Sequence, residues 1–533
     1  MTRQFNTAGP CRSDDHYMLN PLTRIDAEEI ESLIDNKRYF ILHAPRQTGK
    51  TTCLLALMDY LNHGSRYRAL YANIETAQTA RNDVAAGMYS IATAIAAQAN
   101  VWLKDTRLMD WLKEHRQDSP HELVKAILTA WTENSDLPTV LFIDEVDALI
   151  GDTLISLLRQ IRAGYNQRPQ SFPQSIILCG VRDVRDYRIH TAHQEIITGG
   201  SAFNIKAESL RLGNFTQTET EELWRLHEIE TGQLFDSAIW PELWEDTMGQ
   251  PWLVNALAHE CTWKDRAARR DRTIPITLER YKNARERLIQ SRATHLDQLV
   301  DKLREERVRG IVAALLAGEN IETRYPMDDL QYVEDLGLIR GRPQLTIVNR
   351  IYREIIPREL TFPIQVVITQ NPLWYLTPQR HLDISKLLTA FQQFFREHSD
   401  AWLKGFDYRE AGPQLLLQAF LQRIVNGGGR INREYGLGTK RTDLFLEWPI
   451  DEVQGYLGPV QRVVMECKLV YPRRTLESTI ADGIIQTAEY AERCGAAEAH
   501  LLIFDRRPDK TWEERIWQRQ IKEGRREIFV WGA

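Results

Sequence analysis

The segment Ala44-Pro-Arg-Gln-Thr-Gly-Lys-Thr51 has the spacing of the phosphate-binding pattern GxxxxGK[ST], with Ala44 in place of the first glycine. Such a loop binds phosphate through inward-pointing backbone N–H groups and the positive field of a helix N-terminus beneath them. An apolar run precedes the loop over 39–43, and helical spacing follows it over 51–61. Lys50 is expected to reach the β- and γ-phosphates of a nucleotide, and the Thr51 hydroxyl to bind Mg²⁺. The residues expected to contact the nucleotide are Pro45, Arg46, Gln47, Thr48, Gly49, Lys50, Thr51 and Thr52.

Two acidic residues follow the apolar run 141–143 and would complete this chemistry. At the C-terminal end of a strand, Asp144 can hold the water shell of the magnesium ion, and Glu145 can polarise the attacking water. The alternative for Glu145 is a solvated loop carboxylate.

Four further charged residues lie where a γ-phosphate could be sensed. Arg182 and Asp183 follow the next apolar run, 175–181, so either could contact the phosphate, or the two could form an exposed loop ion pair. Arg159 and Arg162 fall on the helix after the acidic pair. One of them could reach into a neighbouring subunit, or both could lie on a solvated helix face.

A second set of residues near the C-terminus could bind a divalent metal. Asp443 begins one predicted strand, and Glu466 and Lys468 share a face of the next, because side chains alternate along a strand. If the two strands pair as a hairpin, Asp443 lies beside Glu466, and the Cys467 carbonyl can add a third metal ligand. Lys468 can lower the pKa of a metal-bound water or orient it. The pattern therefore predicts phosphodiester hydrolysis.

Flanking helices add to this set. Gln486 and Tyr490 are four residues apart on a predicted helix and share one of its faces. An upstream predicted helix, 414–424, carries Gln418. Nearby cations could neutralise a phosphate backbone or lie on a solvated face; they are Arg430, Arg433, Lys440, Arg441, Arg473 and Arg474. Three aromatic residues could stack on bases or belong to a core; they are Trp448, Tyr471 and Tyr490.

The elements that must position the first site are apolar runs separated by helical patterns. Runs at 39–43, 68–74, 139–143 and 175–179 predict a parallel sheet covered on both faces, which is an α/β fold.

The order of these motifs resembles the AAA+ and STAND-type P-loop ATPases. Gly249-Gln-Pro-Trp-Leu253 is similar to the GxP motif of STAND ATPases, and by that resemblance Pro251 contacts the adenine. The stretch Asp335-Leu-Gly-Leu-Ile339 resembles the start of the winged helix that follows the helical lid. The place of an upstream adenine motif is taken by residues 17–24, which do not match one.

The C-terminal set resembles the PD-(D/E)XK nuclease superfamily, and Gln486 with Tyr490 resembles the QxxxY motif of its RecB-like branch. The first core helix of that superfamily often carries a glutamate, where this chain has Gln418. As a whole, the chain resembles bacterial ATPases that join an AAA-like module to such a nuclease domain. Proteins of this construction often serve in phage defence or mobile-element biology. The domains expected are 1–213 (P-loop ATPase core), 214–300 (helical lid), 301–362 (winged helix), 363–380 (linker) and 381–533 (nuclease-like domain).

The composition of the chain excludes several classes of protein and of binding site. The 533 residues carry 67 basic and 73 acidic side chains, a formal net charge of −6, which excludes a histone-like polycation but not a local nucleic-acid site. The six cysteines form no CxxC pair, so neither a disulfide framework nor a zinc ribbon is indicated. No apolar signal core opens the chain, and the alanine-rich stretch 85–103 is too polar for a membrane span. We therefore expect a cytoplasmic protein.

Two hypotheses follow. The first is an ATP-regulated nuclease, in a homo-oligomer, that uses Mg²⁺ or Mn²⁺ and acts on nucleic acid, with DNA favoured. The alternative is a STAND-like signalling or scaffold ATPase whose C-terminal domain binds nucleic acid or protein without cutting. The residue Gln418 favours the second, and the set Asp443, Glu466 and Lys468 favours the first.

Overall fold

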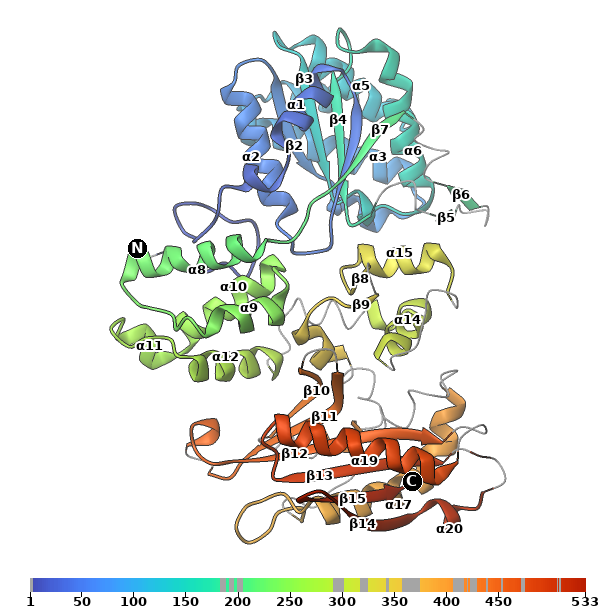
Figure 1. Cartoon of the computed structure of the whole chain (residues 1–533). Helices are drawn as coiled ribbons and strands as arrows, with labels where there is room; N and C mark the ends of the chain where they lie inside the picture. Colours follow the sequence, from blue (N-terminus) through green and yellow to red (C-terminus); the bar gives the residue numbers. More distant parts are fainter. Residues whose placement is uncertain are drawn as a thin grey trace. The chain divides into compact units, whose positions relative to one another are not determined.

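The computed structural model describes residues 3–182, 188–190, 196–198, 205–290, 302–316, 325–341, 345–356, 374–405, 417–418, 420–421, 429–437, 440–451, 454–470, 475–505, 507 and 510–533. The chain divides into two compact units, whose elements are labelled in Figure 1. The first unit comprises Met1–Ile276 and Pro326–Leu338, and the second comprises Thr277–Tyr325 and Ile339–Ala533.

The first unit is built on a five-stranded parallel sheet with the order β2-β3-β4-β1-β7. Its strands are β1 (Tyr39–His43), β2 (Arg68–Asn73), β3 (Thr139–Asp144), β4 (Ser175–Gly180) and β7 (Lys206–Arg211). The parallel sheet expected from the four apolar runs is confirmed. Strand β7 was not predicted, because its sequence Lys-Ala-Glu-Ser-Leu-Arg contains no apolar run, as is common at a sheet edge.

Helices cover both faces of this sheet, and alternate side chains of β1 enter the two cores. Phe40 and Leu42 enter one core, and Tyr39 and Ile41 enter the other. The first face is covered by α1 (Ala27–Asp35) and α2 (Lys50–His63), and the second by α3 (Val84–Leu103), α5 (Leu123–Glu133) and α6 (Gly151–Gly164).

Helix α3 is the alanine-rich helix expected near 85–103. Among the described residues it is the single helix long and apolar enough to cross a membrane, judged by length and composition. Its side chains Met88, Ile91 and Ile95 are fully buried against the sheet, so in this structure it is a core helix.

The lid of the first unit consists of α8 (Gln217–Thr231), α9 (Ile239–Thr247), α10 (Pro251–His259), a π-helical turn (Glu260–Lys264) and α11 (Arg266–Arg270). Thr216 followed three residues later by Glu219 has the spacing that predicts a capping box at the start of a helix. The capping box is present at the start of α8: Thr216 Oγ1 accepts from Glu219 N at 3.2 Å, and Glu219 Oε2 accepts from Thr216 N at 2.7 Å. Tyr17, from the N-terminal segment, is buried in the lid, where its hydroxyl lies 3.2 Å from His227 Nδ1. Tyr17 is therefore part of the lid core.

A late segment returns to the first unit as α15 (Met327–Asp335). The predicted winged-helix interval also contains α14 (Glu306–Leu316), the antiparallel pair β8 (Ile339–Arg340) and β9 (Thr346–Ile347), and helical residues 350–356, which belong to the second unit. The predicted interval 301–362 thus contributes to both units. The domain boundaries stay predictions.

The second unit contains a six-stranded mixed sheet with the order β10-β11-β12-β13-β15-β14. The strands are β10 (Arg430–Leu437), β11 (Lys440–Pro449), β12 (Val460–Val470), β13 (Glu498–Asp505), β14 (Trp517–Glu523) and β15 (Arg526–Gly532). Helix α17 (Ile384–Gly405) contributes to the core on one face, and α19 (Leu476–Arg493) to the core on the other. Strands β10, β11 and β12 are antiparallel neighbours, and β13 runs parallel to β12 after α19.

Shorter elements complete the described chain: η1 (Pro21–Arg24), η2 (Glu75–Ala80), α4 (Arg107–Glu114), η3 (Val146–Ala148), η4 (Tyr165–Gln167), β5 (Arg188–His190), β6 (Ile196–Thr198), α12 (Leu278–Gln290), η7 (Gly455–Leu457) and α20 (Trp512–Arg515).

Candidate functional site

The phosphate-binding loop joins β1 to α2, as predicted. Gln47 (φ 59°) and Gly49 (φ 88°) adopt left-handed backbone conformations, which turn the chain sharply before α2 begins at Lys50. The Lys50 ammonium is inside the loop, donating to the carbonyls of Ala44 at 3.0 Å and Pro45 at 3.1 Å. The loop therefore holds its own lysine at the place where phosphate oxygens would compete for it.

Ala44 departs from the glycine of the pattern without backbone strain. It is fully buried, its N–H donates to Gly180 O at 3.2 Å, and it is not among the described residues with positive φ. The position continues the β1–β4 ladder, where an alanine is tolerated.

Asp144 lies at the C-terminal end of β3, fully buried, and accepts three hydrogen bonds. Its Oδ2 receives the Thr51 hydroxyl at 2.8 Å and the Tyr71 hydroxyl at 2.9 Å, and its Oδ1 receives the Glu145 N–H at 2.9 Å. Thr51 and Asp144 are hard oxygen donors within hydrogen-bonding distance of each other. They fit the hydroxyl and carboxylate expected around Mg²⁺ and its water shell.

Tyr71 is the functional candidate that sequence reasoning missed. It is 5% exposed, and burial, followed by the charge of Asp144, raises the pKa of its phenol well above the ordinary value. The hydroxyl therefore stays protonated and donates. Its strand was predicted, but only the pairing of β2 with β3, with Asn73 opposite Asp144, brings it to this carboxylate.

Glu145 is half-buried beside Asp144 with its backbone in the left-handed region (φ 62°). Burial raises the pKa of its carboxyl, the charges of Asp147 and Asp144 raise it further, and Lys50 and Arg46 oppose the change. A carboxylate with a raised pKa is a stronger base, which suits the predicted role of polarising a water.

Arg182 lies two residues after the end of β4 and is mostly buried. Its side chain is 13% exposed, Nε lies 3.6 Å from Asp335 Oδ2 of α15, and the guanidinium lies 4.6 Å from the centre of the Tyr332 ring. Asp183 falls outside the described residues. Arg159 and Arg162 are exposed on α6.

Three segments that are distant in the sequence contact the phosphate loop. Arg24 Nη1 donates to Thr48 O at 2.7 Å, and Gln250 Nε2 donates to Gln47 O at 3.3 Å. A Cβ on Gly337, just after α15, would lie 2.9 Å from the Pro45 ring. The lid, the N-terminal segment and α15 therefore all meet at the phosphate loop.

The remaining predicted contacts lie around the same loop. Pro251 is the buried first residue of α10, and Gln250 caps that helix by accepting from Leu253 N at 2.6 Å. Thr52 Oγ1 accepts the N–H of Cys11 at 3.1 Å, and Arg46 is exposed. Pro251 as an adenine contact stays a prediction.

In the second unit, β11 and β12 form the antiparallel pair expected for the carboxylate site. Leu444 pairs with Met465, so continuing this register by one residue places Asp443 opposite Glu466. The backbone of Asp443 lies in β11, and its side chain is outside the described set. Glu466 is 2% exposed, and Lys468 Nζ donates to its Oε1 at 2.9 Å.

Helix α19 lies over the same face of the sheet. Val464, two residues before Glu466, packs in one core with Ile480 and Tyr490 of α19. The predicted neighbours Gln486 and Tyr490 are bonded, with Gln486 Nε2 donating to the Tyr490 hydroxyl at 3.2 Å. Cys467 packs on the opposite face, and a ligand role for its carbonyl stays a prediction.

Several residues proposed to contact nucleic acid are buried and cannot do so. Tyr490 is 1% exposed and Trp448 is 4% exposed, with the indole N–H of Trp448 bonded to Arg380 O. Arg430 is 4% exposed, lies 3.6 Å from the centre of the Tyr456 ring and donates to Lys282 O at 3.2 Å. For Trp448 and Tyr490 the structure bears out the alternative of core residues, since Trp448 of β11 and Tyr490 of α19 pack in the two cores of this unit. Arg430 of β10 was expected to bind phosphate or to lie on a solvated face, and it does neither because it is buried. Tyr471, Arg473, Arg474 and the side chains of Arg433, Lys440 and Arg441 are not described.

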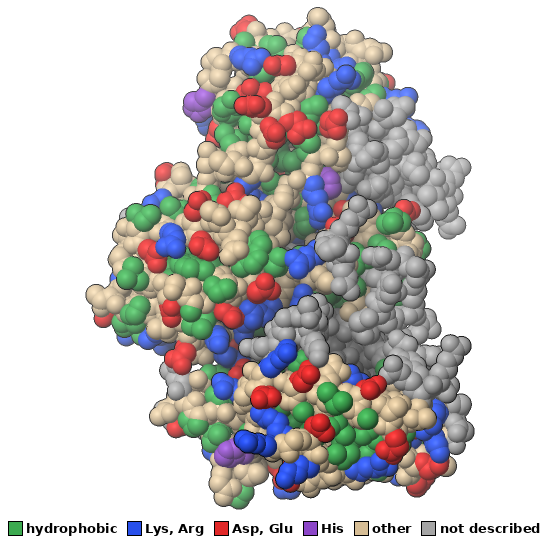
Figure 2. Space-filling model, viewed as in Figure 1, with side chains coloured by type: hydrophobic (Ala, Val, Ile, Leu, Met, Phe, Trp, Pro, Cys, Tyr) green, Lys and Arg blue, Asp and Glu red, His purple; other side chains and the backbone are tan. Residues whose placement is uncertain are grey.

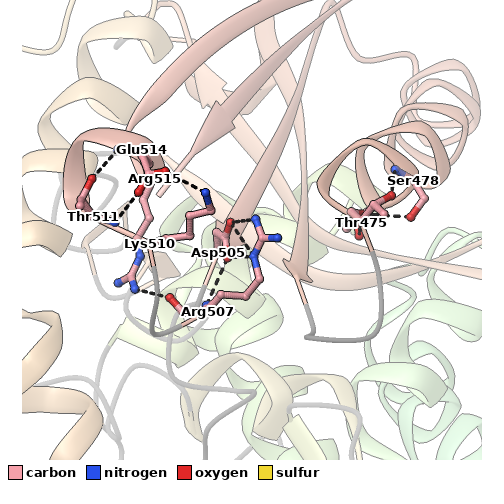
Figure 3. Close-up of polar contacts among 9 residues, drawn as sticks. Thr475, Ser478, Asp505, Arg507, Lys510, Thr511, Glu514 and Arg515 are labelled. Carbon is pink, nitrogen blue, oxygen red and sulfur yellow. Dashed lines mark hydrogen bonds and ion pairs between the residues drawn. The ribbon is translucent and has the colours of Figure 1, made fainter.

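The carboxyl ends of β12 and β13 form the edge beyond Lys468, and Figure 3 shows the polar contacts there. Asp505 ends β13 and accepts from Arg507 Nη2 at 2.6 Å, while Arg515 Nη2 donates to Arg507 O at 2.6 Å. Burial would raise the pKa of Asp505, but the bonds from Arg507 outweigh it and the net shift is downward. Asp505 is thus neutralised by its own loop.

Two observations bear on metal binding at this site. Among the side chains that the structure describes, no three His, Cys, Asp or Glu residues gather as metal ligands. Gln418 is 1% exposed and supplies a neutral amide where the resemblance implies a carboxylate. Glu466 is the described carboxylate that fits a metal here, with Asp443 at the facing register position.

Comparison with known proteins supports the first site. A family model described as an AAA domain matches residues 34–187. No curated protein matches the chain.

Among solved structures, the chain is similar to the Walker-type ATPase PABY2304 of Pyrococcus abyssi, at 15% identity and a TM-score of 0.45, covering 66% of this chain and 99% of that one. It is similar to the ORC2 protein of Aeropyrum pernix, in ADPNP–ADP complexes, at 14% identity and a TM-score of 0.38, covering 64% and 94%. It is also similar to the Holliday junction branch migration motor RuvB of Thermotoga maritima, at 13% identity and a TM-score of 0.33, covering 62% and 94%. The family match over residues 34–187, together with the loop, Asp144 and the parallel sheet, supports an ATPase of the P-loop fold in the first unit.

Proposed function

We propose that this protein binds and hydrolyses ATP, and that its nucleotide state regulates a Mg²⁺-dependent nuclease site in the second unit that acts on nucleic acid, with DNA favoured. The observation that carries the proposal is the cluster of Lys50, Thr51, Asp144 and Glu145 at the carboxyl edge of the parallel sheet.

In the proposed ATPase reaction, different residues bind the phosphates, hold the metal ion and activate the water. The loop N–H groups and the α2 N-terminus bind the phosphates, and Lys50 exchanges its bonds to the Ala44 and Pro45 carbonyls for phosphate oxygens. Thr51 and Asp144 would hold Mg²⁺, which would supply charge neutralisation when bound. Glu145, with its raised pKa, orients and polarises the attacking water. Tyr71 holds the Asp144 carboxylate in the orientation that faces Thr51.

Regulation would pass through Arg182. In this structure its guanidinium is engaged by Asp335 and Tyr332 of α15, at the strand end that the sheet places beside β1 and the loop. A γ-phosphate would compete with Asp335 for it. Because Pro326–Leu338 is joined on both sides to chain of the second unit, release of α15 would be transmitted along the backbone.

The nuclease part rests on chain order and register. A helix, three antiparallel strands, a second helix and a parallel strand follow one another as α17, β10, β11, β12, α19 and β13. This order supports the resemblance that the sequence suggested, with Glu466 and Lys468 on one strand and Gln486 and Tyr490 on the next helix. The neutral Gln418 supports the alternative, a C-terminal domain that binds without cutting.

The first prediction concerns ATP turnover. Lys50→Ala should abolish tight nucleotide binding, and Glu145→Gln should keep binding but lower kcat by roughly a hundredfold or more, because general-base assistance contributes about 10²–10⁴ in rate. Phosphate release and fluorescent-nucleotide titration measure the two effects. Lys113→Gln, on an exposed face of α4, is the control. Unchanged turnover in both site variants would refute the ATPase assignment.

The second prediction concerns Tyr71. Tyr71→Phe removes one of three donors to Asp144, so the Mg²⁺ concentration at half-maximal ATPase rate should rise several-fold, since one such bond is worth about 1–3 kcal/mol. Affinity for ADP without Mg²⁺ should not change. Tyr67→Phe is the matched control, because Tyr67 bonds Asp35 instead. Equal Mg²⁺ dependence in the two variants would contradict the role.

The third prediction concerns the α15 contact. Asp335→Asn should tighten binding of a non-hydrolysable ATP analogue by about tenfold, equivalent to ~1.4 kcal/mol, because Arg182 is then less restrained. ADP affinity should stay constant. Glu334→Gln, which alters the neighbouring pair with Arg211, serves as control. Calorimetric titration that gives equal changes for ATP analogue and ADP would exclude γ-phosphate sensing by Arg182.

The fourth prediction concerns the carboxylate site. Plasmid nicking by the full chain, with Mg²⁺ or Mn²⁺ and with or without ATP, should fall by roughly a hundredfold or more in Glu466→Ala, because loss of a metal-binding carboxylate removes several kcal/mol of transition-state stabilisation. Glu447→Ala, on the neighbouring strand β11 beside Arg462, is the control. Cleavage that persists in Glu466→Ala would show that the site lies elsewhere, and wild-type protein that never cleaves would favour the binding alternative.

A further inference from the structure

The end of the lid carries a cluster of exposed cations around an exposed tryptophan. Lys264, Arg266, Arg269 and Arg270 are all exposed, and Trp263 is 42% exposed with the Arg269 guanidinium 5.1 Å from its ring centre. We call these five residues the lid basic surface. They occupy eight consecutive positions formed by the π-helical turn and α11.

The four cations have no acidic partners in the described part of the chain, where none of them takes part in an ion pair. Some other exposed cations of the first unit do have acidic partners, as Lys113 has in Asp110. Acidic and basic side chains are interspersed over the face seen in Figure 2. Clustered like charges repel each other, so an unpaired cluster is favourable where a polyanion binds.

The aspartate within the segment, Asp265, and the one that directly follows it, Asp271, accept hydrogen bonds from nearby residues of the chain. Asp265 Oδ1 accepts from the N–H groups of Ala267 at 3.0 Å and Ala268 at 3.1 Å, which caps α11. Asp271 Oδ1 accepts from Thr273 N at 3.0 Å and Thr273 Oγ1 at 2.6 Å. Their carboxylates therefore shape the turns and leave the arginines unpaired.

The lid core holds this surface in place. Gln233 is fully buried and donates to Ala268 O at 3.0 Å, within the segment, and to Ile274 O at 2.9 Å, just after it. Arg272 bridges Gln233 Oε1 at 2.8 Å and Thr262 O at 3.0 Å. The cations thus project from a backbone that is already held in place. Binding a ligand would therefore restrict only their side chains and would not have to order the backbone.

We propose that the lid basic surface binds single-stranded nucleic acid, with the four cations on consecutive phosphates and Trp263 stacked on a base. A polyanion matches the cations, and an exposed indole supported by an arginine offers the stacking platform that unpaired bases use. A duplex, whose bases are already stacked, gains nothing from Trp263. This inference deepens the proposed function by giving the ATPase unit its own nucleic-acid contact, yet it depends on neither ATP turnover nor cleavage.

The test is fluorescence anisotropy of the full chain with a labelled oligothymidylate, in EDTA and without nucleotide, over a series of salt concentrations. Changing Lys264, Arg266, Arg269 and Arg270 together to Gln should weaken binding at least tenfold and reduce the slope of log K against log salt by about 3, since each single-strand phosphate contact contributes about 0.7. Trp263→Ala should weaken binding about 5- to 100-fold with the slope unchanged. A matched variant with Lys37, Lys104, Lys113 and Arg116 changed to Gln, all exposed in the same unit, should bind like wild type.

Three outcomes would overturn the inference. Equal affinity and equal salt slope in wild type and the lid variant would place binding elsewhere. If the lid variant lost binding to phosphatidylserine vesicles but still bound the oligonucleotide like wild type, the lid basic surface would be a lipid-binding surface instead. Wild-type affinity in Trp263→Ala would exclude base stacking. Melting curves of each variant exclude unfolding, and ATPase and nicking assays on the same variants separate failure of this inference from failure of the proposed function.

Discussion

The carboxylate of Asp144 is a fully buried negative charge, and hydrogen-bond donors from several parts of the first unit compensate it. A buried carboxylate without hydrogen-bond partners costs several kcal/mol of folding free energy, so the donors to Asp144 must be in place in the folded state. They come from three places: Thr51 at the start of α2, Tyr71 on β2 and the N–H of Glu145 after β3. The parallel pairing of β2 with β3 and the seating of the phosphate loop therefore depend on one another, and the site that would hold Mg²⁺ forms as the sheet forms.

The backbone carbonyls of the phosphate loop accept hydrogen bonds both from the loop's own lysine and from side chains of neighbouring segments. Lys50 satisfies the carbonyls of Ala44 and Pro45, while Arg24 and Gln250 bind two later carbonyls of the loop, those of Thr48 and Gln47. An arriving phosphate must compete for these groups. Because the braces belong to the N-terminal segment and the lid, and Gly337 abuts Pro45 from the α15 segment, nucleotide binding has direct physical routes to the parts of the unit that surround the loop.

The second unit shows where pattern reasoning succeeds and fails. Alternation along β12 placed Glu466 and Lys468 on one face, and the structure bonds them; helical spacing placed Gln486 beside Tyr490, and the structure bonds those as well. The same reasoning left Trp448 and Tyr490 as either base-stacking or core residues and Arg430 as either a phosphate-binding or a solvated cation, and all three are buried. Residue type says that an aromatic can stack or an arginine can bind phosphate, but which face of an element is covered depends on the other elements that pack against it.

The sequence by itself determined the phosphate loop, the acidic pair after β3, the four apolar strands and the capping box of α8, because each depends on local spacing and on residue types with one strong preference. Tertiary structure alone decided that β7 joins the sheet edge, that Tyr71 reaches Asp144, that Arg182 is engaged by Asp335, and that α15 belongs with the ATPase unit. Each of these joins residues far apart in the chain. Contacts of that kind follow from strand order and packing, which no local pattern encodes.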